Sequence, residues 1–144
     1  MFFAALTIAF ATAAETTNIT AIINAKHLKF TSDDSAQVSQ KALELLASCT
    51  YLNANPKWGA GGSEPLSIVD AQKQSHLHLS FSSPVKVEVP IVKATLRVRE
   101  MVISLPLVTG AIWVRSEDKV LFLAKFDHKA HENLQHLLEE AQKP

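Results

Sequence analysis

Residues 76–90 read HLHLSFSSPVKVEVP, and this stretch decides the fold class. Apolar and polar side chains alternate strictly from His76 to Phe81, and the alternation returns over residues 85–89 with charged groups on the polar side. Because successive side chains of a strand leave opposite faces of a sheet, both segments are predicted to be half-buried strands. Pro84 and Pro90 border the second segment, and since proline donates no backbone hydrogen bond, a strand end, an edge or a bulge is expected at each.

The apolar positions change parity within the next segment, residues 92–105. Even-numbered residues are apolar as far as Val98, and odd-numbered residues are apolar from Met101 onward. One flat strand would place one of these two sets in water. The sequence therefore predicts a β-bulge or a tight break near Arg99 and Glu100.

Two further strands are predicted at residues 111–115 and 119–126. The polar connection at residues 116–119 separates two apolar runs and is typical of a hairpin. Residues at both parities of the second strand are apolar, which predicts a strand that is central in the sheet or covered on both faces.

Two helices are predicted outside this run of strands, at about 33–49 and 127–142. Capping and acidic residues at 31–34 mark the start of the first helix, and its thin polar stripe indicates burial over most of its surface. The second is amphipathic and begins at a capping Asp. A strand kinked near Asn24 is expected over residues 17–30.

These predictions together specify an α+β fold. Its order is β-α-loop-β-β-β-β-β-α, with a curved antiparallel sheet of about five to six strands covered on one face by both helices. The loop spans residues 50–65, and residues 66–69 form a short strand after it. The order is similar to helix-grip and cystatin-like architectures, which often hold apolar ligands between sheet and helix, but likeness of fold alone implies no function.

The first residues are interpreted as a secretory signal peptide. Residues 1–14 carry no charge, and their apolar run at 2–10 is too short to span a bilayer and is followed by a small-x-small triplet. Cleavage is expected near Ala13 or Ala14, which leaves a single α+β domain at 15–144 exported to the periplasm or the exterior. The alternatives are an N-terminal element packed on the core and a start further upstream.

Charge and cysteine content exclude several classes of partner. The chain has 144 residues with 14 basic and 14 acidic side chains, and its formal net charge is zero. A nucleic-acid partner is not expected, because the basic surface that attracts phosphates is missing, and no stable membrane span is expected after the signal peptide. Cys49 is the only cysteine, so no internal disulfide forms, and it is predicted to be a buried residue at the C-terminal end of its helix.

Two groups of histidines are candidate metal ligands. His76 and His78 leave the same face of a strand, but a zinc site needs at least a third ligand, and two solvated imidazoles on the outer face are the alternative. His128, Glu132 and His136 lie on adjoining turns of the last helix, where a solvated polar face is the alternative. A zinc-protease motif is rejected for His131 and His136, because these two histidines are five residues apart instead of four.

Arginines on the central strands form a third candidate site. Arg97 and Arg99 share one strand face and could recognise an anion, with Glu100 and Arg115 close by. Cross-strand ion pairing is the more usual use of such residues. The glycine-rich residues 59–63 lack the spacing and the lysine of a phosphate-binding loop.

The sequence supports three hypotheses about function and assigns no catalytic residue, no metal ligand and no cofactor. The first is a small exported, non-enzymatic domain that binds a protein partner or a small ligand. The second is a metal-binding protein or small enzyme that uses His76 and His78. The third is a structural protein that assembles, for example as a homodimer, through an exposed sheet edge.

Overall fold

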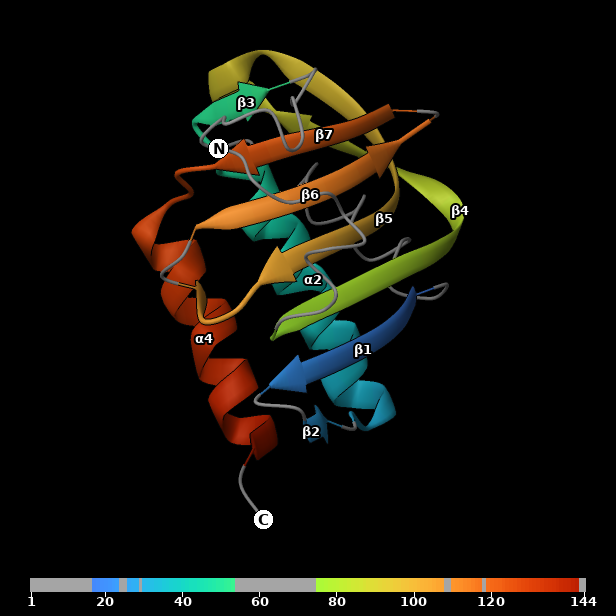
Figure 1. Cartoon of the computed structure of the whole chain (residues 1–144), viewed down its shortest axis with the longest axis vertical. Helices are drawn as coiled ribbons and strands as arrows, with labels where there is room; N and C mark the ends of the chain where they lie inside the picture. Colours follow the sequence, from blue (N-terminus) through green and yellow to red (C-terminus); the bar gives the residue numbers. More distant parts are fainter. Residues whose placement is uncertain are drawn as a thin grey trace.

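The computed structural model describes residues 17–23, 26–28, 30–53, 75–107, 110–117 and 119–142. Within these ranges an antiparallel sheet of seven strands is packed against two helices, so the predicted α+β class is confirmed (Figure 1). The helices are α2 (Ser32–Ala47) and α4 (His128–Gln142). The strands are β1 (Thr17–Ile23), β2 (Lys26–Leu28), β3 (Tyr51–Asn53), β4 (His76–Val89), β5 (Ala94–Ser104), β6 (Ala111–Ser116) and β7 (Lys119–Ala124).

The sheet is open, and its strand order is β2-β1-β4-β5-β6-β7-β3. The number of strands is seven, where about five to six were predicted. Two short strands are added, and the two strands predicted at residues 76–81 and 85–89 form the single strand β4. β1 and β2 pair antiparallel where one kinked strand was predicted over residues 17–30, with Ile23 paired to Lys26. Tyr51–Asn53 pairs with β7 inside the segment predicted as loop. A three-residue strand of this kind depends on its distant partner, so local periodicity gives no signal for it. The predicted strand at 66–69 lies outside the described residues.

Both predicted irregularities of the central strands are present. β4 is one bent strand, and its register against β5 shifts between Ser80 and Val85, around Pro84. The register of β5 against β6 shifts between Val98 and Glu100, where the apolar positions change parity. This bulge keeps both apolar sets of β5 on the core side.

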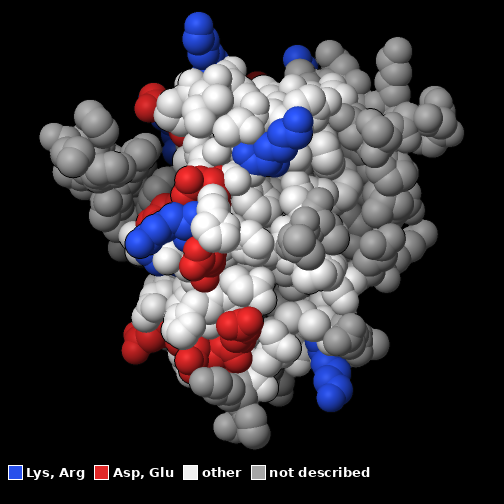
Figure 2. Space-filling view, turned by 90° about the vertical axis from the view of Figure 1, so that its left-hand side faces the viewer, with Lys and Arg blue, Asp and Glu red and all other residues white. Residues whose placement is uncertain are grey.

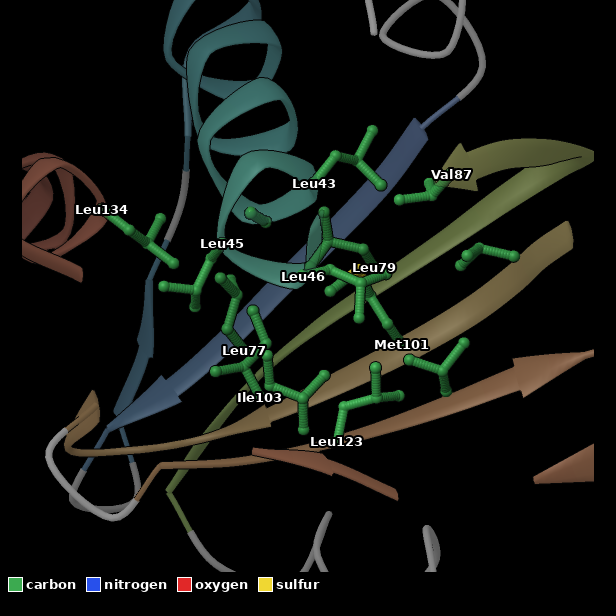
Figure 3. Close-up of a cluster of buried hydrophobic side chains, with 14 of the residues drawn as sticks. Leu43, Leu45, Leu46, Leu77, Leu79, Val87, Met101, Ile103, Leu123 and Leu134 are labelled. Carbon is green, nitrogen blue, oxygen red and sulfur yellow. The ribbon is translucent and has the colours of Figure 1, made fainter. Parts of the chain in front are cut away.

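The main core lies between the sheet and the two helices. Leu43 and Leu46 of α2 face Leu79 and Met101 of the sheet, and Leu134 of α4 lies beside α2 (Figure 3). These five side chains are completely buried. Burying one such side chain stabilises the fold by about 1.5–3 kcal/mol, so this contact holds the helices on the sheet.

A second, smaller apolar cluster lies on the opposite face of the sheet. It contains Val102 and Trp113, which are 0% and 2% exposed, with Val120 and Phe122 packed against them. The rings of Trp113 and Phe122 meet edge to face at a centroid distance of 5.4 Å. β7 lies between β6 and β3, so the prediction that the strand of residues 119–126 is central in the sheet is confirmed. Its apolar residues lie on both faces, because Leu121 and Leu123 belong to the main core while Val120 and Phe122 are half-buried on the opposite face.

Capping groups hold the helix ends in place. The Thr31 hydroxyl accepts a hydrogen bond from the backbone N–H of Asp34, and the Asp127 carboxylate accepts bonds from the first turn of α4. The backbone N–H of Asp127 also donates to the Ser48 hydroxyl, which joins the start of α4 to the end of α2. Neither helix of the described ranges has the length and apolar content needed to cross a bilayer.

Candidate functional site

Three polar side chains meet on the sheet face that points away from the helices. His78 comes from β4, Glu100 from β5 and Arg115 from β6, and we call them the polar trio. Glu100 lies directly opposite Arg115 in the strand register, and it is also opposite Ser80, two residues along β4 from His78. Direct and diagonal neighbours on one face of a sheet lie within reach of long side chains. The register therefore brings three residues from distant parts of the sequence together.

Glu100 is the centre of the polar trio. One carboxylate oxygen lies 2.7 Å from Nε2 of His78, and the other accepts a hydrogen bond of 3.1 Å from Nε of Arg115. An ionised carboxylate can only accept hydrogen bonds, so Nε2 of His78 carries the proton in this contact. The carboxylate thereby fixes the orientation of the imidazole ring, and Nδ1 is the ring nitrogen left for another partner.

The environment of Glu100 favours its charged form. Burial is the largest single influence and raises the pKa of this carboxyl, but the hydrogen bonds and positive charges of His78 and Arg115 together outweigh it and lower the pKa below its usual value. The side chains are 20% exposed for His78, 25% for Glu100 and 41% for Arg115. The trio is thus a preorganised polar group that solvent can reach.

The structure separates the predicted histidine pair. His76 and His78 lie on the same sheet face, as expected, but His76 is only 3% exposed, whereas His78 bonds to Glu100. His76 lies opposite Ser104 of β5 and Ile22 of β1, further from the trio. Among the described residues, no group of three or more His, Cys, Asp or Glu side chains could hold a metal ion.

The polar trio fits a cation poorly. Each oxygen of Glu100 already accepts one hydrogen bond, and Nε2 of His78 carries a proton in this contact, so that nitrogen has no lone pair for a metal. The guanidinium, which keeps its charge at every relevant pH, would also repel a divalent ion at this distance. The N–H groups of Arg115 that do not contact Glu100 can donate to an anion instead.

Two of the three histidines of α4 form separate pairs with glutamates. His128 lies 2.6 Å from Glu132, and His136 lies 3.8 Å from Glu140. Each pair is four residues apart and well exposed, as on a solvated helix face. The three residues named from the sequence, His128, Glu132 and His136, are not brought together around one point.

The arginines predicted to recognise an anion have different surroundings. Arg115 reaches Glu100, so a cross-strand ion pair forms in the predicted region. Arg97 is exposed and lies directly opposite Lys86, a residue of the same charge. Arg99 is exposed at the register shift between β5 and β6.

Cys49 is buried in the main core, as predicted. Burial raises the pKa of its thiol from 9.0 to about 12, so the reactive thiolate is scarce at neutral pH. The glycine-rich residues 59–63 and the signal-peptide prediction for residues 1–14 lie outside the described residues.

Sequence reasoning named all three members of the polar trio and placed Glu100 near Arg115, but it did not connect His78 to them. His78 was considered as a metal ligand, while Glu100 and Arg115 were considered beside the other arginines. The parity change before Met101 was the signal that could have joined them, because the bulge puts Glu100 on the same face as His78. Comparisons of the chain with protein-family models, with curated proteins and with solved structures found no match.

Proposed function

We propose that this chain is a small exported, non-enzymatic domain that binds an anionic group of a ligand or partner at the polar trio. The observation that carries the proposal is the shared contact of His78 and Arg115 with one carboxylate. Glu100 holds the side chains of His78 and Arg115, both hydrogen-bond donors, next to each other where solvent can reach them. Export is supported by the uncharged apolar run in residues 1–14.

The donors of the trio exceed what Glu100 can use. A guanidinium has five N–H donors, and a carboxylate can engage at most two of them in a bidentate contact, so at least three donors of Arg115 are left. Arg115 is 41% exposed, so these donors can reach a ligand. Nδ1 of His78 adds a further donor when the ring is protonated. A carboxylate or phosphate oxygen is the chemical group that this set of donors fits.

A binding role also agrees with the rest of the described chain. Helix-grip and cystatin-like architectures often hold apolar ligands between sheet and helix, and here leucines and other buried side chains fill that space in the described chain (Figure 3). The single thiol is buried and protonated, which argues against a cysteine nucleophile. The polar trio, which solvent can reach, is therefore the better place to look for a ligand.

The proposal can be tested by following backbone amide signals in an NMR titration. Acetate, inorganic phosphate and citrate are added at constant ionic strength, with glycerol as an uncharged comparison. We expect saturable shifts at residues 78, 100 and 115 with an anion and none with glycerol. The shifts are expected to be lost in Arg115→Gln and kept in Arg99→Gln, which removes an exposed arginine of the same sheet whose side chain forms no ion pair with Glu100. Equal shifts in both variants, or no saturable shift, would overturn the proposal.

Two further measurements separate the alternatives. Native mass spectrometry with added zinc would favour the metal hypothesis if a stoichiometric ion were bound and then lost in the His76→Ala, His78→Ala double variant. Export is tested by expressing the chain from Met1 and sequencing the N-terminus of the secreted protein. We expect a new N-terminus near Ala14, and retention of Met1 would refute the signal-peptide prediction.

A further inference from the structure

The hairpin end of β4 and β5 carries an unusual charge pattern on its outer surface. We call residues 85–98 the β4–β5 arm. β5 pairs with β6 only from Val98 onward, so the arm extends past the edge of β6, and it curves to the top of the view in Figure 1. Its inward side chains are buried in the main core, which makes the arm a fixed platform.

The exposed side of the arm has a positive net charge. Lys86, Lys93 and Arg97 are exposed there, and Glu88 is the only acidic residue, which gives a net charge of +2. The three cations form no ion pair or side-chain hydrogen bond with any described residue. Lys86 and Arg97 are also direct cross-strand partners. Like charges directly opposite each other destabilise a sheet, so the pairing of Lys86 with Arg97 does not stabilise the isolated chain.

The α4 helix has the complementary charge. Over residues 128–142 it carries Glu132, Glu139 and Glu140 against the single cation Lys129, a net charge of −2, and these side chains are exposed. Figure 2 looks onto the side of the molecule where α4 lies, and Asp and Glu side chains gather on this side. The neutral chain is therefore divided into a basic arm and an acidic helix.

Each charged surface has an exposed apolar side chain near it. Ile91 and Tyr51 are the exposed large hydrophobic residues of the described chain, at 63% and 37% exposure. Ile91 lies at the tip of the arm. Tyr51 pairs with the last residue of β7, close before the start of α4, and its ring lies 5.8 Å from the ammonium of Lys125. Apolar contact can thus accompany charge pairing on both surfaces.

We propose that the β4–β5 arm of one molecule binds the exposed face of α4 on a second copy of the chain. The mixed charge of the arm favours a protein surface over a uniformly anionic partner, because Glu88 would be repelled by a membrane or by nucleic acid but can pair with Lys129. Three cations and one apolar residue also fall short of what stable membrane attachment requires. The proposal does not depend on the polar trio, none of whose residues belongs to the arm or to α4.

The test is an exchange of charge between the two surfaces. An arm variant carries Lys86→Glu and Arg97→Glu, and a helix variant carries Glu132→Lys and Glu139→Lys. Sedimentation velocity of the full chain at about 100 µM and low salt reports the mass, since contacts between exposed charges are weak and screened by salt. We expect the unmodified chain to sediment as more than one copy, each variant alone as a monomer, and an equimolar mixture of the two to associate again.

A matched control has the same net charge as the arm variant. Lys26→Glu with Lys119→Glu reverses two exposed lysines outside the arm and is expected to leave association unchanged. Circular dichroism checks that each variant is folded. A monomeric unmodified chain, or a mixture that stays monomeric while both variants are folded, would overturn the proposal. Loss of association in the control would overturn it as well, because net charge alone would then explain the effect.

Discussion

The repulsion between Lys86 and Arg97 can be measured directly as a coupling energy. The two residues are exposed, directly opposite each other and unpaired with any acidic side chain of the described chain. Cross-strand charge pairs change stability by about 0.2–1 kcal/mol, and like charges do so unfavourably. We therefore expect Lys86→Gln to stabilise the fold by about 0.2–1 kcal/mol, although it removes a charged surface residue.

A double-mutant cycle isolates this interaction. Lys86→Gln and Arg97→Gln each remove the same repulsion, so the double variant should be no more stable than either single variant. Urea unfolding at low salt and low protein concentration gives the four free energies of unfolding. The melting temperature is expected to rise by at most about 5 °C. In about 1 M salt, where the screening length falls to about 3 Å, the coupling should largely disappear.

The control cycle combines Lys86→Gln with Lys119→Gln. Lys119 is exposed and lies opposite Ser116, so the two substitutions should be additive. A coupling of zero or of attractive sign between Lys86 and Arg97 at low salt would refute the argument that these cations destabilise the isolated chain. The case for a partner at the arm would then lose its physical basis.

Three other predictions concern the stability of the fold and the reactivity of Cys49. Glu100→Gln should lower stability by about 1–2 kcal/mol at neutral pH, since bonds between charged groups are lost. Because the folded pKa of Glu100 is lowered, its contribution to stability is complete above its unfolded pKa and is lost as the pH falls through the folded value. Urea titrations of the variant and the unmodified chain should therefore converge in acid. Leu79→Ala should lower the free energy of unfolding by about 2–5 kcal/mol, because this side chain is 0% exposed. Ile91→Ala should lower it by less than about 0.5 kcal/mol, because Ile91 is 63% exposed. Equal losses in chemical denaturation would contradict the described core. Cys49 should react with a thiol reagent only as fast as the chain unfolds, and rapid reaction in the native state would show that the thiol is accessible.

Local patterns predicted most of the fold, because they depend on the period of the chain. Alternation over residues 76–90 and the helical pattern at 33–49 gave the class, and both helices and the bulge before Met101 are confirmed. The strands at residues 26–28 and 51–53 were missed. Each has only three residues and gains its stability from a neighbouring strand, so its own sequence holds too little signal.

The candidate site, like the fold, could be predicted from the sequence only in part. The sequence by itself determined that His78 lies on the polar face of a strand and that Glu100 lies at a change of parity. Only the tertiary structure decided that Glu100 stands between His78 and Arg115, because strand order and register set which side chains of three separate strands meet. The charged surfaces divide in the same way. The net charges of +2 over residues 85–98 and −2 over residues 128–142 can be counted in the sequence, because both segments are continuous. Only the tertiary structure decided that these side chains are exposed and that Lys86 lies opposite Arg97, because strand register sets which residues face each other.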